Sequence, residues 1–407
     1  MRVPNGIMSN VSARMANEVA CWNTARDFTK KEITPVAAHY DEHDEFPRDI
    51  LRRAFETGLM NVEVPEAYGG LGGSCLDHCL IQEEVAYGCL GFNTSLAANM
   101  LGAMPVLVAG TDAQKKEWLG RLTDGGEFAA YCCSEPDAGS DVAGLSTRVR
   151  KDGDDYVITG QKMWITNSLQ ADWMCMLVNT GEGAPHKNKS LVMVPMRDGP
   201  NGKLTQGISV AQKIKKIGMN SSDTGLIYFD EVRVPLANVV GQLNDGWTVA
   251  KALLGHERFN VGKIGRSKRE LQLLKRIAAR PRADGRSLLQ NGAFAQQIAQ
   301  VEVDILALEA TVLRLVSAAK KGQGNGAEAS VLKLHGTAVA QRITGLLVDA
   351  LGEDINSQTP IGAEAADPTP AALGLQHLNW RKLTIYGGSD EVQKTVLAKS
   401  MLAGAAR

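Results

Sequence analysis

The spacing of apolar residues changes twice along the chain, and this change constrains the fold more than any other feature. Residues 1–127 carry apolar side chains at helical spacing, residues 128–240 alternate as strands do, and helical spacing returns in residues 241–407. Each block is long enough to bury a core of its own. The pattern predicts an α+β multidomain chain with an N-terminal helical domain, a middle β-barrel-like domain and a C-terminal four-helix bundle.

Local signals support each block. A helix is expected after Pro47, because the fixed φ of proline suits a first helical turn. Asp152-Gly153 lies between two strand-like runs and indicates a hairpin turn. In the last block, apolar periodicity predicts four long helices, at 247–279, 293–321, 327–351 and 374–402.

Composition narrows the class of protein. The 44 Lys and Arg residues nearly balance the 45 Asp and Glu residues, so the total charge gives no reason to expect nucleic acid as a partner. We expect no membrane span, because no uninterrupted apolar run approaches the ~20 residues that a spanning helix needs. Cys75, His78 and Cys79 lie close together, but they have no second ligand pair, and buried thiols are favoured over a metal site.

Two segments in the middle block have the composition of a ligand site. The segment from Tyr131 to Asp141 alternates small and hydroxyl residues with turn formers directly after an apolar strand. Such a loop exposes N–H groups and hydroxyls that suit a flat polar heterocycle or a phosphate. About thirty residues on, Trp164, Ile165 and Thr166 place a large aromatic ring beside a hydroxyl. Taken alone, either segment is equally compatible with a surface loop or a packed strand.

Together and in this order, the segments resemble the acyl-CoA dehydrogenase family. The first matches the family's Y-C-x-[ST]-E-P-x-A-G-S-D signature and the second its W-I-T-N segment. Further matches are Pro65 to Gly70, Asp223-Thr224, Phe229 to Pro235 and Ile385 to Gln393. The resemblance extends over residues 20–403, and the N-terminal two thirds look especially like the medium-chain members.

The resemblance implies FAD as cofactor and assigns roles to individual residues. Tyr131, Cys133 and Ser134 would line the isoalloxazine, Trp164 would cover a ring face, and Thr166 would hydrogen-bond near the reactive nitrogen N5. Ile165 is a further cofactor-binding position. Ser389 and Glu391 fall where the family holds the FAD phosphates and adenine. The substrate positions implied are Ser140 for the CoA moiety, together with Arg258 and Gly388.

The family's usual base is absent at its usual place. Many members carry a Glu directly before the Gly-[ST] of the C-terminal motif, and here that position is Gly387. A second family arrangement places the Glu on the first helix of the C-terminal bundle, and Glu257-Arg258 matches its L-x-x-E-R pattern. Glu257 is therefore the expected base, with His256 and Glu391 as alternatives. Gly387 would supply the backbone N–H that polarises the thioester oxygen.

Two other elements depart from the family pattern. The family's Arg-x-x-Phe-Gly is replaced by Arg280 to Gly285, and its Q-x-x-G-G reads Asp349 to Glu353. Carboxylates near the FAD phosphates are costly unless paired. The leading expectation is an active dehydrogenase that forms a homotetramer or heterotetramer and passes electrons from an acyl-CoA substrate to an electron-transfer flavoprotein. The alternative is a non-catalytic subunit that completes the FAD site of another chain; an oxidase, a desulfinase or a nitroalkane enzyme stays open as a variant chemistry.

The expected compartment follows from two sequence features. Seven cysteines are too few for a disulfide scaffold in a chain of this length, which indicates a reducing environment. Residues 1–14 lack the apolar core of a secretory signal. A bacterial cytoplasm is expected, with the mitochondrial matrix as the alternative.

Overall fold

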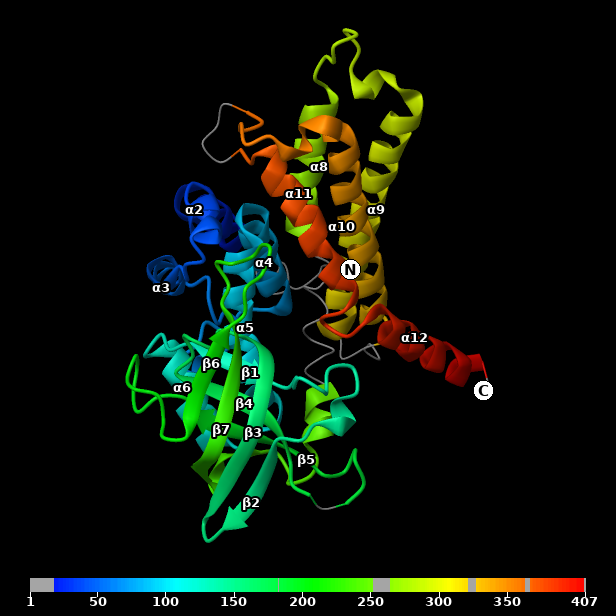
Figure 1. The fold of residues 1–407 in the computed structure, drawn as a ribbon. Coiled ribbons are helices and arrows are strands. Elements are labelled where there is room, and N and C mark those ends of the chain that lie inside the picture. The colour runs from blue at the N-terminus through cyan, green and yellow to red at the C-terminus, as the bar shows by residue number, and fades with distance from the viewer. Residues whose placement is uncertain (1–17, 182, 252–263, 321–326, 363–366, 406–407) are drawn as a thin grey trace, which may run out of the picture.

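The computed structural model describes residues 18–181, 183–251, 264–320, 327–362 and 367–405. Figure 1 shows N-terminal helices beside a sheet, with a bundle of long C-terminal helices packed on the other side of the N-terminal helices. Within the N-terminal block, helix α4 (Cys75–Gly88) packs on the bundle and helix α5 (Leu90–Ala109) packs on the sheet.

The N-terminal block is helical as expected. A helical segment at 18–28 continues into a π-helical turn, η1 (Thr29–Ile33). The elements that follow are α2 (Ala37–Glu42), α3 (Arg48–Glu56), η2 (Glu66–Tyr68), α4 (Cys75–Gly88), α5 (Leu90–Ala109) and α6 (Asp112–Thr123). Pro47 is the N-cap of α3, whose Ile50, Leu51 and Ala54 are buried.

Capping interactions determine where α4 and α6 begin. The Ser74 Oγ accepts from the N–H of Asp77 at 3.2 Å, and the Asp77 carboxylate accepts from the N–H of Ser74 at 2.8 Å. Thr111 and Gln114 make the same reciprocal pair at the start of α6. Each pair satisfies donors that a helix terminus leaves open.

Helix α5 runs through the core. It is apolar and long enough by length and composition to cross a membrane, but 67% of its most apolar window is buried inside the protein. Its neighbours α4, α6 and the strand β1 (Ala129–Cys132) cover it. Among the described helices, the one that is long and apolar enough to cross a membrane is thus mostly buried inside the fold.

The middle block forms one mixed sheet. Its other strands are β2 (Arg148–Asp152), β3 (Asp155–Thr166), β4 (Trp173–Asn179), β5 (Lys189–Pro195), β6 (Ile208–Lys213), β7 (Thr224–Pro235) and β8 (Val239–Val240). The order is β6-β7-β3-β2-β4-β5-β8, with β1 parallel to β4. The predicted hairpin is present, because β2 and β3 pair antiparallel across Gly153, whose φ is +64°. Among the described strands, the end strands β6 and β8 do not pair with each other.

The C-terminal block is a helical bundle whose last helix differs from the prediction. Residues 246–251 are helical and α8 is Ile264–Ala278, while the middle of the helix expected at 247–279 lies outside the described residues. The helices α9 (Gly292–Lys320) and α10 (Ala329–Leu351) lie close to their expected bounds. The single helix expected at 374–402 is wrong. The chain forms α11 (Pro370–Asn379), the 3-10 turn η7 (Trp380–Thr384) and α12 (Asp390–Ala405). Gly387 and Gly388 have positive φ, which a continuous helix cannot contain.

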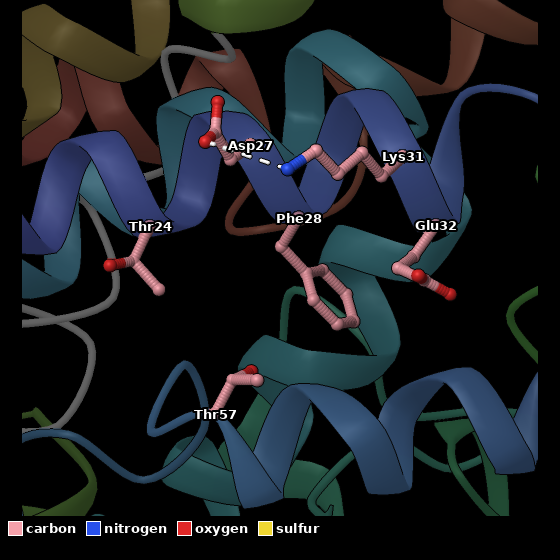
Figure 2. Close-up of a pocket in the computed structure, with 6 residues that line it drawn as sticks. All are labelled: Thr24, Asp27, Phe28, Lys31, Glu32 and Thr57. Carbon is pink, nitrogen blue, oxygen red and sulfur yellow. Dashed lines mark ion pairs between the residues drawn. The ribbon is translucent and has the colours of Figure 1, made fainter.

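A shallow surface hollow lies in the N-terminal block, between the first helical segment and the end of α3 (Figure 2). An exposed ion pair between Lys31 and Asp27, 3.8 Å apart, borders it. The hollow is lined by Thr24, Asp27, Phe28, Lys31, Glu32 and Thr57. None of these residues belongs to the two middle-block segments or to the C-terminal motif.

Close packing of α4 on α8 joins the N-terminal block to the bundle. A Cβ built on Gly265 would lie 1.9 Å from the carbonyl oxygen of Glu83. The Lys268 ammonium pairs with Glu83 at 2.5 Å, and Tyr87 donates to Gln272 at 2.6 Å. The absence of a side chain at 265 therefore allows the two helices to approach.

We expect Gly265→Val to lower the free energy of unfolding by about 1–3 kcal/mol, because the added side chain must push α8 away from α4. Thermal and denaturant unfolding would measure it. Gly345→Ala in α10 is the matched control: no atom lies within 4 Å of its Cβ position, so the helix should gain roughly 0.5–1 kcal/mol. Equal stability of both variants would contradict the packing interpretation.

Candidate functional site

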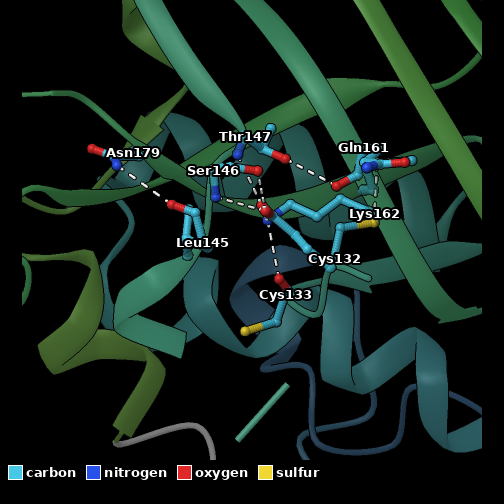
Figure 3. Close-up of polar contacts among 10 residues, drawn as sticks. Cys132, Cys133, Leu145, Ser146, Thr147, Gln161, Lys162 and Asn179 are labelled. Atoms are coloured by element: carbon cyan, nitrogen blue, oxygen red, sulfur yellow. Dashed lines mark hydrogen bonds and ion pairs between the residues drawn. The ribbon is translucent and has the colours of Figure 1, made fainter. Parts of the chain in front are cut away.

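The structure brings the two middle-block segments together. The N–H of Met163 donates to the carbonyl oxygen of Ser134 at 2.9 Å. The Lys162 ammonium donates to the carbonyl oxygen of Cys133 at 3.0 Å (Figure 3). Tyr131, Cys133 and Ser134 are half-buried at this junction. A loop after β1 and a segment of β3, far apart in the sequence, thus form one site.

A buried ion pair lies beneath this junction. Lys162 is fully buried and its Nζ is 2.9 Å from Oε1 of Glu135, whose side chain is 3% exposed. The same carboxylate accepts from the N–H and the hydroxyl of Ser146, at 2.6 and 2.8 Å, and from the N–H of Thr147 at 3.0 Å. Both charges are therefore compensated, as buried charges need to be.

The contacts of Glu135 determine its ionisation. Burial alone would raise the pKa of this carboxyl, but the Lys162 ammonium and the hydrogen bonds from Thr147, Lys162 and Ser146 lower the pKa to about 2. Glu135 is consequently ionised at neutral pH. Its carboxylate binds both the residues just before β2 and Lys162 of β3, and so joins the two strands.

Trp164 projects from the sheet at a distorted point of β3. The β3–β7 register shifts between Lys162 and Ile165, and Trp164 has φ +65°. Its side chain is 56% exposed, whereas Ile165 is buried. A non-glycine residue in this conformation is strained, and strain of this kind accumulates at ligand sites. The bulge therefore exposes the Trp164 side chain next to Met163, whose N–H binds the carbonyl oxygen of Ser134.

Two buried asparagines, Asn167 and Asn99, join the end of β3 to α5 and β1. Asn167 is fully buried with φ +62°, and its amide donates to the carbonyl oxygens of Ser95 at 3.0 Å and Ala129 at 3.3 Å. Asn99 on α5 accepts from the N–H of Ala129 at 3.0 Å. Thr166, next to Asn167, is half-buried and pairs with Thr224. The sheet and α5 thereby hold Thr166 beside the Trp164 bulge.

These groups fit a flat ligand with a polar edge. An exposed indole supplies a stacking face. Half-buried hydroxyls, a thiol and backbone groups at Tyr131, Cys133, Ser134 and Thr166 supply donors and acceptors along one rim.

No three His, Cys, Asp or Glu side chains gather as metal ligands in the part of the chain that the structure describes. Cys75 and Cys79 lie on α4, where His78 approaches Glu63 at 3.4 Å.

The remaining expected site residues lie in two other places. Ser140 is exposed on the loop that leads from Glu135 to β2. Gly387, Gly388 and Ser389 form the turn before α12, and Glu391 is exposed in the first turn of that helix. Helix α12 extends away from the body of the protein (Figure 1).

Glu257, Arg258 and His256 lie outside the described residues. Helical residues 246–251 precede this stretch and α8 follows it at Ile264. The assignment of the base therefore stays a prediction.

The two altered elements have local roles in this chain. Arg280 donates to the carbonyl oxygen of Ile361, which ties the end of α8 to the loop before α11. Asp349 and Glu353 are both exposed. Within this chain the two carboxylates are solvated, so they bear no burial cost.

Sequence reasoning did not identify the polar groups that hold the site. Glu135 and Asn167 lie inside the two family motifs, and Lys162 lies two residues before the second, but the sequence assigned no role to them or to Asn99. Glu and Lys residues are rarely buried in proteins unless they are paired. That rule was the available signal for the ion pair.

Comparisons with known proteins agree over nearly the whole chain. Three family models match this chain. The model of the acyl-CoA dehydrogenase N-terminal domain matches residues 16–126, that of the middle domain matches residues 130–232, and that of the C-terminal domain matches residues 244–402. A probable medium-chain specific acyl-CoA dehydrogenase 2, mitochondrial, from Caenorhabditis briggsae is 32% identical over 93% of this chain and 88% of its own length.

Solved structures share the fold. Butyryl-CoA dehydrogenase from Megasphaera elsdenii has a TM-score of 0.84 at 25% identity, over 95% of this chain and 98% of its own. A putative acyl-CoA dehydrogenase from Mycobacterium smegmatis has a TM-score of 0.84 at 29% identity, over 94% and 97%. The predicted fold class is confirmed.

We expect Glu135→Gln to lower the free energy of unfolding by about 3–5 kcal/mol at neutral pH, because it leaves the Lys162 ammonium buried without its partner charge. Since the folded-state pKa is depressed from 4.5 to about 2, the stabilisation by Glu135 is present above pH 4.5 and is lost as the pH falls towards 2. Thermal unfolding between pH 7 and 3 should show the wild type approaching the variant.

The double variant Glu135→Gln, Lys162→Met is the control for this prediction. It removes both charges and should be more stable than Glu135→Gln alone. A double variant that is no more stable than the single one, or parallel pH profiles for wild type and Glu135→Gln, would contradict a stabilising charge pair.

Proposed function

The chain belongs to the acyl-CoA dehydrogenase family, whose members are FAD-dependent oxidoreductases acting on CH–CH groups, and we propose that it removes hydrogen from the α and β carbons of an acyl-CoA. The product would be the trans-2-enoyl-CoA, with electrons passed to an electron-transfer flavoprotein. The observation that carries the proposal is the junction of the Tyr131–Ser134 loop with the Trp164 bulge, held by the buried Glu135–Lys162 pair.

The described residues fit the isoalloxazine of FAD. Tyr131, Cys133 and Ser134 would contact its polar edge, Trp164 would cover one face, and Thr166 would donate near N5. Ile165 is buried and would support the site from the core of the sheet. When bound, FAD accepts the hydrogen that leaves the β-carbon as hydride. The protein's part is to fix the orientation of the cofactor against the substrate.

Glu257 and Gly387 would carry out the two remaining tasks, which are removal of the α-proton and polarisation of the thioester oxygen. The Glu257 carboxylate would take the α-proton. An α-proton is weakly acidic, so its removal requires stabilisation of the negative charge that develops on the thioester oxygen. The N–H of Gly387 would supply that donor; no described group accepts it. Arg258, Gly388 and Ser140 would contact the substrate, and Ser389 and Glu391 the distal part of FAD.

Assembly and location are part of the proposal. Exposed apolar side chains at Val303, Leu306 and Leu313 form a stripe on α9, and Met401 and Leu402 are exposed on α12. Exposed apolar side chains on two helices support association with other subunits. The assembly that we propose is a homotetramer or a heterotetramer with a related subunit. A bacterial cytoplasm is proposed as the compartment, with the mitochondrial matrix as the alternative.

A non-catalytic subunit is the second candidate. The altered elements at Arg280–Gly285 and Asp349–Glu353 favour it, because the family's cofactor contacts are replaced there. The complete Tyr131–Asp141 and Trp164–Thr166 segments support the active enzyme instead.

We expect the chain expressed alone to be yellow and to be bleached by an acyl-CoA in the absence of oxygen. Glu257→Gln should retain the colour but bleach ~10²–10⁴-fold more slowly, since the general base is lost. Stopped-flow absorbance would measure the rate. Glu302→Gln, on the exposed face of α9, is the matched control and should bleach like the wild type.

Other outcomes identify other assignments. Wild-type rates in Glu257→Gln would make the base assignment wrong and would call for His256→Asn and Glu391→Gln. A colourless protein that gains flavin only beside a partner chain would support the non-catalytic subunit.

The substrate class proposed is a medium-length, bulky or long acyl chain. Helix α5 is buried on most sides, but Thr94, Ala97 and Leu101 form a half-exposed stripe at helical spacing. The small side chain of Ala97 leaves volume on this stripe.

Ala97→Phe should therefore shift the preferred acyl-CoA to shorter chains, because the ring fills that volume. Isothermal titration across a series of chain lengths would measure the shift, with Ala293→Phe at the exposed start of α9 as a control. Binding of short chains alone by the wild type would contradict the proposed substrate class.

A further inference from the structure

A buried amide holds the turn that precedes α12. Gln393 is 1% exposed, and its Nε2 donates to the carbonyl oxygen of Gly387 at 3.1 Å. Its Oε1 accepts from the hydroxyl of Ser330 at 2.7 Å, and Ser330 is fully buried in the first turns of α10. A carbonyl oxygen can only accept, so the amide nitrogen must face Gly387 and the hydroxyl must donate to the amide oxygen. The orientation of the Gln393 side chain is therefore determined.

The turn needs such an anchor because its backbone is intrinsically free. Gly387 and Gly388 have φ of +66° and +79°, and glycine occupies positive and negative φ with similar ease. The peptide between them could turn over without steric cost. Gln393 prevents this by binding its carbonyl oxygen, and the turn packs directly on the amide: a Cβ at Gly388 would lie 2.2 Å from Nε2.

Fixing the carbonyl of Gly387 also fixes the N–H of Gly388 on the opposite side of the same peptide. In a planar trans peptide the C=O and N–H point in opposite directions, so the N–H of Gly388 points away from Gln393. The N–H groups of Gly387 and Gly388 have no acceptor among the described residues. Adjacent N–H groups left open in a turn of positive φ are suited to an oxygen that carries negative charge.

A separate contact anchors the helix but not this peptide. Lys333, fully buried on α10, is 2.5 Å from the carboxylate of Asp390, and Ser389 Oγ accepts from the N–H of Val392 at 3.3 Å. These contacts hold the start of α12. Only Gln393 binds the Gly387–Gly388 peptide, so its effect on the turn can be separated from the stability of α12.

We propose that Gln393 is a positioning residue that sets the Gly387–Gly388 peptide, so that the N–H of Gly388 joins the neighbouring N–H of Gly387 as a donor to the thioester oxygen. The inference rests on the proposed function, in which Gly387 polarises that oxygen. Ser330 acts one step further away by orienting the Gln393 amide.

The test is Gln393→Met, which keeps the length of the side chain but can neither donate nor orient the peptide. We expect kcat to fall on the order of 10–100-fold, less than direct loss of an oxyanion donor, with KM changed little. The decisive readout is the carbonyl stretch of a ¹³C-labelled acyl-CoA bound to the protein: its shift to low frequency should shrink in the variant. Gln114→Met is the matched control, because Gln114 is a buried amide that holds the carbonyls of Ala237 and Val239 far from this turn.

Two further variants keep the test decisive where Gln393→Met folds poorly. Gln393→Glu should regain carbonyl polarisation as the pH is lowered, because only the protonated carboxyl can donate to Gly387. Ser330→Ala should weaken the shift by a smaller factor, since the amide is then free to rotate.

A wild-type carbonyl shift in Gln393→Met, or a loss of equal size in Gln114→Met, would overturn the positioning role. If acyl-CoA bleaches the wild-type flavin without any carbonyl shift, the donor role of Gly387 is wrong and the inference fails with it. If acyl-CoA does not bind at all, the proposed function itself is wrong.

Discussion

The buried pair of Glu135 and Lys162 is the interaction on which the site depends. It joins a loop after β1, the start of β2 and the bulged part of β3 through one carboxylate and one ammonium. Removing either charge leaves the other in a medium of low dielectric constant, where it is strongly unfavourable. The carboxylate is thus a structural centre for the cofactor side of this acyl-CoA dehydrogenase family member, and it need not touch a reacting atom.

Different contacts hold the blocks together and hold the site within each block. Helix α5 lies between the sheet and the helices of the N-terminal block, while α4 packs on α8 through the contact at Gly265. The cofactor-side loop and the turn before α12 belong to different blocks, and each is held by its own buried polar group: Lys162 with Glu135 in the first, and Gln393 with Ser330 in the second. Precision at the site therefore depends on polar contacts within each block as well as on apolar packing between blocks.

Much of the fold could be predicted from the sequence, and the failures have physical causes. Helices α9 and α10 lie close to their predicted bounds, because their apolar periodicity is long and regular. The helix predicted at 374–402 was wrong because apolar periodicity continues through η7, whereas the positive φ of Gly387 and Gly388 depends on tertiary anchoring by Gln393. The predicted cofactor segments do meet, but the contact between Glu135 and Lys162 joins residues 27 apart, which no spacing rule specifies. The bulge at Trp164 likewise depends on the register of β7.

The contact of Asn99 with β1 limits which substitutions on α5 the protein can accept independently. Asn99 lies on α5 two residues from Ala97, and its amide oxygen holds the N–H of Ala129 at the start of β1. A substitution that reshapes the half-exposed stripe of α5 by moving the helix also moves the strand that leads to Tyr131. In the enzyme that we propose, acyl-chain preference and cofactor geometry would therefore be mechanically linked. Evolution or engineering can alter the preference freely only by exchanging side chains on a stationary α5.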